Sequence, residues 1–339
     1  MPKVSVIIPN YNHARYLRQR IQSVLDQTFQ DFDLTYLDDA SSDDSNAVFA
    51  EFEPQPRIKA IYNNLNSGSP FKQWNKGFRA TEGEYVWIAE SDDVADPDFL
   101  ATLVPMLDDN PNVGIAYSQS CRIDRNNVVF EPTLRQWVED LDPDRWEQDF
   151  VANGISECQN YLVFKNTIPN ASAVLIRRSI YEAIGGAEES LFLSGDWITW
   201  INILLKSDIA FCAQPLNSFR THKSSVRSQT SLNGTAIYEN ILIRQNIGNS
   251  VSIPPQTWLK IAEESISGWI DLTFDPESTI GLQDHLKFYQ LVGTTVPHIE
   301  IVMFKQLIYY LKNQSSRKVR SWIPRSIKTV LKKINSSPA

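Results

Sequence analysis

Residues 3–25 of this 339-residue chain read KVSVIIPNYNHARYLRQRIQSVL, and they set the pattern for its amino-terminal half. The first seven residues are rich in β-branched side chains and predict a short buried strand. After a polar turn, apolar residues recur at the spacing of one face of an amphipathic helix: Leu17, Ile21, Val24 and Leu25. The stretch therefore predicts a strand followed by a helix.

The alternation of strand and helix continues to about residue 91. Further strands are predicted at residues 31–41, 58–64 and 84–91, and a helix at residues 71–81. This alternation is typical of a parallel sheet with right-handed crossovers, so the predicted fold class is α/β. Beyond residue 111 the rhythm weakens. There we predict strands at 114–124 and 171–179, helices at 180–186 and 196–207, and mostly helices from about residue 233.

Polar side chains gather where each of the first four strands ends. The clusters, in chain order, are PNYNH, DDASSDDS, NNLNSGS and ESDD. Ligands bind beyond the carboxyl ends of the strands in such sheets, so the clusters predict one ligand-binding edge. The first strand is followed by neither GxGxxG nor GxxxxGK, so the sequence does not support a classical dinucleotide-binding fold or a P-loop.

Composition predicts an ordinary globular protein, with 42% hydrophobic and 21% charged residues. The amino terminus has no signal-peptide pattern, and no segment offers the ~20 apolar residues of a membrane span, so we expect an unprocessed cytoplasmic protein. Cys121, Cys158 and Cys212 lie far apart without a CxxC pair, which favours reduced thiols over a disulfide framework or a zinc site. The sequence leaves the oligomeric state open.

Charge is distributed unevenly along the chain. The net charge is −8, yet the residues after 300 include nine basic and no acidic ones, which leaves −17 on residues 1–300. In this tail, apolar residues share one helical face: Ile323, Ile327, Val330, Leu331 and Ile334. Cationic amphipathic segments attract anionic lipid, so residues 315–339 predict peripheral membrane contact. Packing of this face on the catalytic domain or a second subunit is the alternative, and nucleic-acid binding is not expected of an acidic body.

An acidic pair, Asp92 and Asp93, directly follows a strand rich in Val, Trp and Ile. Partial burial and mutual repulsion raise carboxylate pKa values, so we expect a cation beside the pair. Oxygen ligands of this kind suit Mg²⁺ or Mn²⁺. Asp96 and Asp98 precede the apolar run FLATLVPML, and we assign them to the start of a helix.

Five motifs together resemble the inverting family 2 glycosyltransferases: VSVIIPNYNHARYL, LDDASSDDS, GEYVWIAESDD, GDWITW and FRTH. They follow the family order over about residues 1–225. The resemblance implies a Rossmann-like GT-A domain at residues 1–230 and leaves residues 231–339 as a mostly helical region. It also implies transfer of a sugar from a nucleotide-diphosphate sugar, with UDP favoured, to a glycan or lipid-linked hydroxyl, as in the synthesis of bacterial surface polysaccharides.

The resemblance further assigns a nucleotide-binding set: Pro9, Tyr11, Asn12, Asp39, Lys72 and Asp92. Pro9 and Tyr11 would border the base, with Tyr11 stacked on it. Asp39 would accept a hydrogen bond from a uracil-type imide, although Asp38 and Asp39 equally suit a strand-end turn. Asp92 would support the sugar or ribose side. Lys72 would neutralise phosphate or remain a solvated helix lysine.

The same resemblance assigns the chemistry to three residues. Asp93 would bind the metal that bridges the diphosphate, and His222 would complete the metal or diphosphate site. Asp196 would be the base that deprotonates the acceptor hydroxyl. Its alternative role is an ordinary helix N-cap, for which Ser194 is the other candidate.

Two residues depart from the family pattern. Glu90 stands where Asp is frequent, and Gly195 stands where an acidic residue is frequent. Two rival functions are also considered: a nucleotidyltransferase or phosphotransferase, for which the expected glycine-rich basic loop is missing from the sequence, and a nucleotide-sugar binding protein without turnover.

Overall fold

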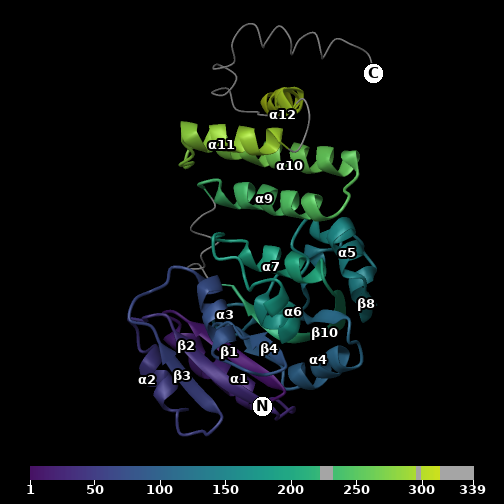
Figure 1. Cartoon of the computed structure of the whole chain (residues 1–339). Coiled ribbons are helices and arrows are strands. Elements are labelled where there is room, and N and C mark those ends of the chain that lie inside the picture. The colour runs from purple at the N-terminus through teal and green to yellow at the C-terminus, as the bar shows by residue number, and fades with distance from the viewer. Residues whose placement is uncertain (222–231, 295–298, 314–339) are drawn as a thin grey trace. The chain divides into compact units, whose positions relative to one another are not determined.

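The computed structural model describes residues 1–221, 232–294 and 299–313. The chain divides into two compact units, Met1–Ser225 and Val226–Ala339 (Figure 1). The first unit is built on a ten-stranded sheet, and the described part of the second unit contains helices and their connections. Among the described helices, none is long and apolar enough to cross a membrane.

The amino-terminal half of the sheet has the strand order β3-β2-β1-β4, and each neighbouring pair is parallel. These strands are β1 (Val4–Asn10), β2 (Phe32–Asp38), β3 (Ile58–Tyr62) and β4 (Tyr85–Ile88). The intervening helices are α1 (Ala14–Leu25), α2 (Ser45–Ala50) and α3 (Pro70–Arg79). The predicted α/β alternation is confirmed, and the short helix α2 is an addition to it.

The other half of the sheet mixes strand directions. β9 (Val174–Arg177) lies antiparallel between β4 and β6 (Val113–Ile123), which is parallel to β10 (Asp208–Arg220). Short antiparallel strands complete the sheet: β5 (Val94–Ala95), β7 (Val129–Glu131) and β8 (Phe150–Ala152). β10 was not predicted from the sequence, because its register shifts around Pro215 interrupt a regular strand pattern.

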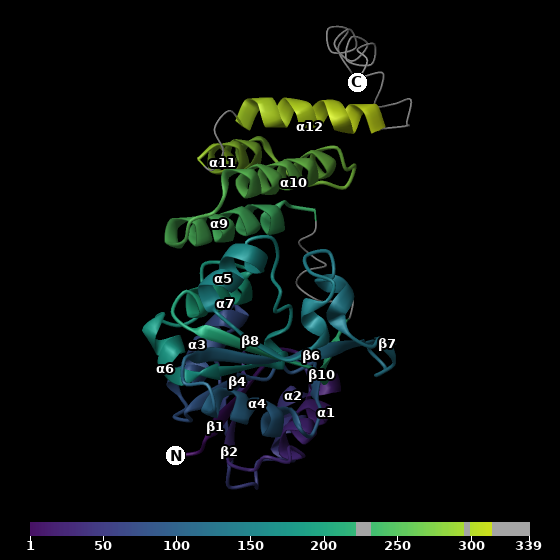
Figure 2. The ribbon, with the colours of Figure 1, turned by 90° about the vertical axis from the view of Figure 1, so that its right-hand side faces the viewer.

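Helices cover both faces of this sheet (Figure 2). On one face, α1, α2 and α4 (Phe99–Asp108) share a buried apolar cluster with the strands. On the other face, α3 lies so close that a Cβ on Gly77 would sit 2.4 Å from Cγ2 of Ile7. Glycine therefore lets this helix approach the sheet. Three more α-helices lie in the described part of the unit: α5 (Gly154–Glu157), α6 (Arg178–Ala183) and α7 (Gly195–Leu204).

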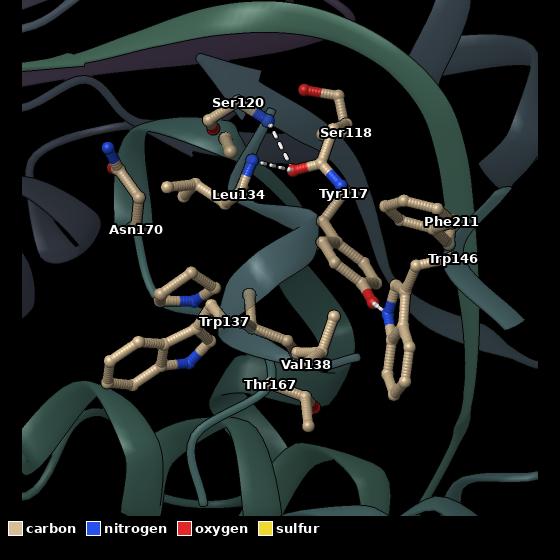
Figure 3. A pocket seen from close by; sticks show the side chains of 14 residues that line it. Tyr117, Ser118, Ser120, Leu134, Trp137, Val138, Trp146, Thr167, Asn170 and Phe211 are labelled. Carbon is tan, nitrogen blue, oxygen red and sulfur yellow. Dashed lines mark hydrogen bonds between the residues drawn. The ribbon is translucent and has the colours of Figure 1, made fainter. Parts of the chain in front are cut away.

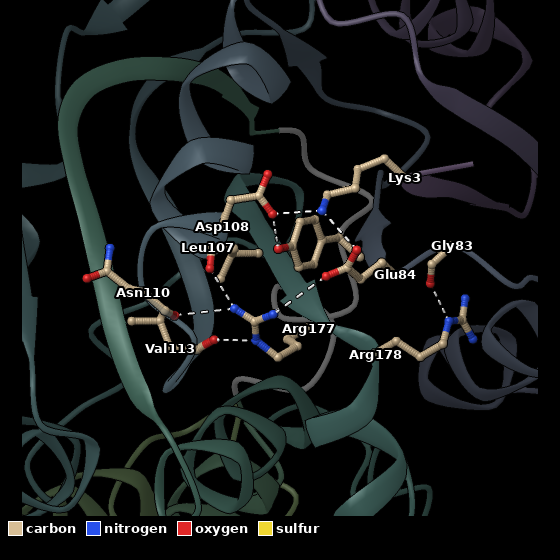
Figure 4. A network of polar contacts seen from close by, with 10 residues as sticks. Lys3, Gly83, Glu84, Leu107, Asp108, Asn110, Val113, Arg177 and Arg178 are labelled. Carbon is tan, nitrogen blue, oxygen red and sulfur yellow. Dashed lines mark hydrogen bonds and ion pairs between the residues drawn. The ribbon is translucent and has the colours of Figure 1, made fainter. Parts of the chain in front are cut away.

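A charged network holds the amino ends of the strands together (Figure 4). Lys3, just before β1, pairs with Glu84 at 2.8 Å and with Asp108 at 2.7 Å. Arg177 donates hydrogen bonds to three main-chain carbonyls, those of Leu107, Asn110 and Val113. In parallel strands this edge is opposite to the polar clusters, so we assign these charges to stability.

The second unit contains α9 (Thr235–Ser250), α10 (Pro255–Thr273), α11 (Leu282–Gly293) and α12 (Ile299–Asn313). Its core centres on Trp269, whose ring stacks on Phe288 at 4.2 Å. The expectation of a helical carboxyl-terminal region is confirmed for these helices. The predicted lipid-binding segment, residues 315–339, lies outside the described residues.

Candidate functional site

The polar clusters after the first strands meet at the carboxyl edge of the sheet. Asn10 pairs with Asp38 in the β1–β2 register, and its Nδ2 donates to Ser41 Oγ at 3.1 Å. His13 Nδ1 lies 2.8 Å from Ser91 Oγ in the turn after β4. Parallel strands thus bring four loops, distant in sequence, to one edge.

The predicted base-binding residues lie at the end of β1 and in the turn that follows it. Pro9 is buried within the strand, whereas the Tyr11 ring is 48% exposed and available as a stacking surface. Asn12 has a positive φ of 58°, and its Oδ1 accepts hydrogen bonds from Ser42 N at 2.8 Å and Asp43 N at 3.3 Å. Asn12 therefore connects this turn to the loop after β2.

Asp39, which directly follows β2, accepts several hydrogen bonds from the loop after β3. Its buried carboxylate accepts hydrogen bonds from Asn63 Nδ2 at 2.6 Å, Gln73 Nε2 at 2.9 Å, and both N and Oγ of Ser67. Asp38 is also buried, and its Oδ2 accepts a hydrogen bond from Ser41 N. Both residues thus take part in loop architecture. Lys72 is exposed, and its Nζ donates to Ser67 O at 3.2 Å.

Asp93 is the most enclosed acid of the turn after β4, with 2% of its surface exposed. Its Oδ1 accepts a hydrogen bond from Arg220 N at 2.8 Å, and its Oδ2 accepts one from Asn170 Nδ2 at 3.1 Å. Burial and the neighbouring charge of Asp92 raise the pKa of Asp93. Asp92 itself is half-buried. The pair therefore concentrates negative charge in a poorly solvated place.

Glu90 adds a third carboxyl group to this turn. Burial, followed by the charges of Asp92 and Asp93, raises its pKa to about 8, although Trp74 Nε1 donates a hydrogen bond to Glu90 Oε1 at 2.7 Å. The Trp74 ring in turn stacks at 5.8 Å on Trp200 of α7. Glu90 thus connects the acidic turn, through aromatic rings, to the helix of the predicted base.

The raised pKa of Glu90 predicts a pH dependence of stability in the metal-free protein. Between pH 4.5 and about 8, Glu90 binds more protons in the folded state than in the unfolded state. The free energy of unfolding therefore falls as the pH rises through that range. We expect Glu90→Gln to be more stable than the wild type at pH 8.5, by on the order of 1–2 kcal/mol, and to show little gain at pH 4.5.

Urea unfolding in EDTA at both pH values measures this difference in the free energy of unfolding. Glu139→Gln is the matched control, because Glu139 is exposed. Equal pH slopes for the wild type and Glu90→Gln would contradict the burial argument.

Two arginines lie beside the acidic turn. Neither was given a role from the sequence. Arg220 donates from Nε to Asp92 O at 2.6 Å and from a terminal nitrogen to Asp124 O at 2.8 Å. Arg20 is fully buried, 5.0 Å from the Trp87 ring, and its three guanidinium nitrogens have no hydrogen-bond partner within the described residues. Its pKa is lowered to about 10 by burial, against the opposing charges of Asp93, Glu90 and Asp92.

The sequence did carry a signal for Arg20, because it lies three residues after Leu17 and four before Val24, on the apolar face of α1. A charged residue within an apolar stripe indicates a buried charge that needs compensation. For Arg220 the signal was the FRTH motif itself. His222, the other predicted residue of that motif, lies outside the described residues.

The donor set fits a divalent cation shared with a phosphate ligand. Asp92 and Asp93 offer oxygen donors, and a cation beside them would stabilise the ionised form of Asp93, whose pKa is raised by burial and by the charge of Asp92. Within residues 1–221, 232–294 and 299–313, no group of three His, Cys, Asp or Glu side chains could hold a metal. The remaining ligands would then be phosphate oxygens and water, as is common for Mg²⁺.

Asp196 lies in the first turn of α7, and Ser194 is the N-cap of this helix. Ser194 makes no side-chain cap hydrogen bond, whereas Asp196 Oδ1 accepts one from Trp197 N at 2.7 Å, a contact within the first turn of the helix. Asp196 Oδ2 accepts a hydrogen bond from Asn166 Nδ2 at 3.1 Å. A Cβ on Gly195 would lie 2.5 Å from Cε2 of Phe71, so this ring fills the place in which an acidic side chain would begin.

A small cavity is lined in part by residues 167–170, the segment whose Asn170 contacts Asp93 (Figure 3). Its lining includes Gln119, Trp137, Thr167 and Asn170, and its volume is about 20 Å³. Gln119 Oε1 accepts hydrogen bonds from Ser120 N and Leu134 N, which fixes one wall. The cavity offers room for a water molecule rather than for a sugar ring.

Known proteins share both sequence and fold with this chain. An uncharacterized glycosyltransferase from Nostoc sp. is 40% identical over 137 residues, which cover 40% of this chain and 41% of the relative. Poly(ribitol-phosphate) beta-N-acetylglucosaminyltransferase TarS from Staphylococcus aureus is 30% identical over 112 residues, 32% of this chain and 20% of TarS. The matched region thus spans well under half of either relative.

Solved structures with the same fold cover more of the chain. The crystal structure of S. aureus TarS 1–349 in complex with UDP-GlcNAc has a TM-score of 0.64 at 15% identity and covers 98% of this chain and 91% of that chain. The mannosyltransferase PcManGT from Pyrobaculum calidifontis, in complex with GDP-Man and Mn²⁺, has a TM-score of 0.58 at 15% identity and covers 95% and 83%. These similarities confirm the predicted fold class.

The family model "Glycosyl transferase family 2" matches residues 5–185, just over half of the chain. The matched range includes the strand ends that carry Tyr11, Asp39 and the acidic turn. This chain belongs to glycosyl transferase family 2.

Proposed function

We propose that the protein is a metal-dependent inverting glycosyltransferase that moves a sugar from a nucleotide-diphosphate sugar to a hydroxyl of a glycan or lipid-linked acceptor. One observation carries the proposal. Asp93 in the acidic turn and Asp196 on α7 both accept hydrogen bonds from one short segment, residues 166–170. The site thus has one carboxylate suited to a metal and a separate one suited to a base. The names of the fold relatives, which mention UDP-GlcNAc and GDP-Man with Mn²⁺, support this class of donor.

In the proposed reaction, Asp196 removes the proton of the acceptor hydroxyl while that oxygen attacks the anomeric carbon of the sugar. The bond from this carbon to the nucleotide diphosphate breaks on the opposite face, so the configuration inverts and the diphosphate leaves with the bonding electrons. Asp93 and Asp92 would hold Mg²⁺ or Mn²⁺, and such an ion stabilises the charge of the leaving diphosphate. His222 would complete this part of the site.

The nucleoside would bind over the turn after β1. The exposed ring of Tyr11 would stack on the base beside Pro9, and Asn12 would keep that turn attached to the loop after β2. Asp39 would accept a hydrogen bond from the ring imide of uracil in place of one of its three contacts with Ser67, which lie at 2.8, 2.9 and 3.1 Å. Lys72 reaches the same loop and would face phosphate.

A thermal-shift screen tests the class of donor. The probes are UDP, GDP, dTDP, UDP-GlcNAc, UDP-Glc and GDP-Man, each with MnCl₂ and with EDTA. A ligand that binds only the folded state raises the melting temperature, by an amount that grows with its affinity. We expect a rise with a uridine nucleotide that depends on Mn²⁺. If none of the nucleotides shifts the melting temperature under either condition, the proposed function is wrong.

The lipid-linked acceptor suggests a role for the basic tail, residues 315–339. Its seven basic residues from Arg317 onward would contact anionic lipid and hold the enzyme at a membrane surface. Flotation with phosphatidylglycerol liposomes, with and without this tail, tests the proposal. Equal flotation of the two proteins would contradict it.

A further inference from the structure

The two ends of the segment 166–170 carry the same kind of hydrogen bond, from a main-chain N–H to the side chain of an asparagine. Asn166 Oδ1 accepts a hydrogen bond from Ile168 N at 3.1 Å, and Asn170 Oδ1 accepts one from Ser172 N at 2.7 Å. In each case the side chain caps the amide two residues further along the chain. Because a main-chain N–H only donates, this contact assigns the oxygen of each side-chain amide and leaves its NH₂ group directed elsewhere.

The two NH₂ groups donate hydrogen bonds to the two carboxylates of the site. Asn166 Nδ2 donates to Asp196 Oδ2, and Asn170 Nδ2 donates to Asp93 Oδ2, both at 3.1 Å. A hydrogen bond to a carboxylate is charge-assisted and stronger than a neutral one. Each carboxylate is thus held by a neutral donor whose own orientation is fixed by the main chain.

The segment is itself well supported. Asn166 and Asn170 are buried, and Ile168 between them is fully enclosed. Trp137 Nε1 donates a hydrogen bond to Asn166 O at 2.7 Å. A short buried segment with fixed ends has little freedom to change the distance between its side chains. The positions of Asp196 and Asp93 are therefore coupled through it.

We propose that Asn166 and Asn170 are a pair of positioning residues that set the geometry of the reaction centre. Asn166 orients the base toward the acceptor hydroxyl, and Asn170 orients the carboxylate that binds the metal and, through it, the diphosphate. This inference rests on the proposed function of Asp196 and Asp93. It assigns an effect on turnover to Asn166 and an effect on nucleotide affinity to Asn170, although the two residues are of the same type and lie four residues apart.

The test is the separation of turnover from nucleotide affinity. The variants are Asn166→Ala and Asn170→Ala. The readouts are calorimetric affinity for UDP with MnCl₂ and the turnover number for hydrolysis of the UDP-sugar that gives the largest thermal shift. We expect Asn166→Ala to lower turnover about 10–100-fold with UDP affinity within about twofold, because misplacement of a catalytic group has this cost. We expect Asn170→Ala to weaken Mn²⁺-dependent UDP binding about 10–100-fold.

A matched control exists elsewhere in the fold. Asn153 caps α5 through Oδ1, which accepts a hydrogen bond from Ser156 N, and its Nδ2 donates to Asp208 Oδ1 at 3.1 Å. Asn153→Ala therefore removes a comparable pair of contacts at an exposed position outside the site, and we expect it to change neither turnover nor UDP affinity. Asn166→Asp keeps the shape of the side chain and the contact with Ile168 N, and it places a carboxylate against Asp196. Asn166→Asp should lose at least as much turnover as Asn166→Ala. It replaces the alanine variant in the test if that variant does not fold.

The outcomes separate this inference from the proposed function. If the wild type neither binds any of the screened nucleotides with Mn²⁺ nor hydrolyses any of the screened nucleotide sugars, both the function and the inference are wrong. If the wild type does both, the inference alone is overturned by wild-type values in the Asn166 and Asn170 variants. Equal loss of turnover and UDP affinity in both variants would overturn it as well, since that result indicates a general structural defect.

Discussion

Asp196→Asn is expected to lower turnover by about 10²–10⁴-fold, the contribution typical of a positioned general base. The amide cannot take the proton of the acceptor hydroxyl. Asp196 is half-buried in the first turn of α7, and its two oxygens accept hydrogen bonds from Asn166 Nδ2 and Trp197 N. An amide of the same shape keeps the surrounding packing and one of these two contacts. Nucleotide affinity should remain within about twofold, because the nucleotide is proposed to contact other residues.

The measurement is single-turnover hydrolysis of the UDP-sugar, together with calorimetric binding of UDP in MnCl₂. Asp208→Asn is the matched control, because Asp208 also accepts a hydrogen bond from an asparagine amide, that of Asn153. It should leave both quantities unchanged. Wild-type turnover in Asp196→Asn would remove Asp196 from the mechanism and favour a binding protein or a different base.

Asp93→Asn is expected to weaken Mn²⁺-dependent UDP binding by more than about 100-fold, because a charged oxygen ligand is replaced by a neutral one. Folding should survive. The substitution removes a buried carboxylate whose pKa is raised by burial and by Asp92. Removal of this charge opposes the loss of a hydrogen bond that the carboxylate accepts.

Calorimetry with UDP in MnCl₂ and in EDTA measures the loss, and thermal melting in EDTA checks the fold. Asp96→Asn is the control, since Asp96 is exposed near the same turn and its Oδ1 accepts a hydrogen bond from Asp98 N at the start of α4. We expect its UDP affinity to match that of the wild type. Undiminished metal-dependent binding by Asp93→Asn would rule out this aspartate as a metal ligand.

Much of the amino-terminal fold follows from local sequence patterns. The apolar runs of β1, β2 and β4 carry enough β-branched and aromatic residues to identify buried strands, and the loops that follow them are visibly polar. The position of Asp96 and Asp98 at the start of α4 also followed from local chemistry. These features depend on neighbours within about ten residues, which the sequence displays directly.

The missing features depend on contacts between distant residues. β10 joins the sheet through β6, about a hundred residues earlier, and Arg220 at its end contacts the acidic turn 128 residues away. Asn166 and Asn170 attracted no attention in the sequence, because their importance arises only when the fold brings them to Asp196 and Asp93. Likewise, only the fold shows that the ring of Phe71 leaves no room for a side chain at Gly195.

The most direct test of the account is the position of Mn²⁺ in crystals grown with MnCl₂ and UDP. Anomalous diffraction identifies the ion without assumptions about the protein. We predict a peak bonded to the Asp93 carboxylate and to the diphosphate, with the uracil ring against Tyr11. A peak remote from Asp93, or a diphosphate bound away from the acidic turn, would contradict the central claim.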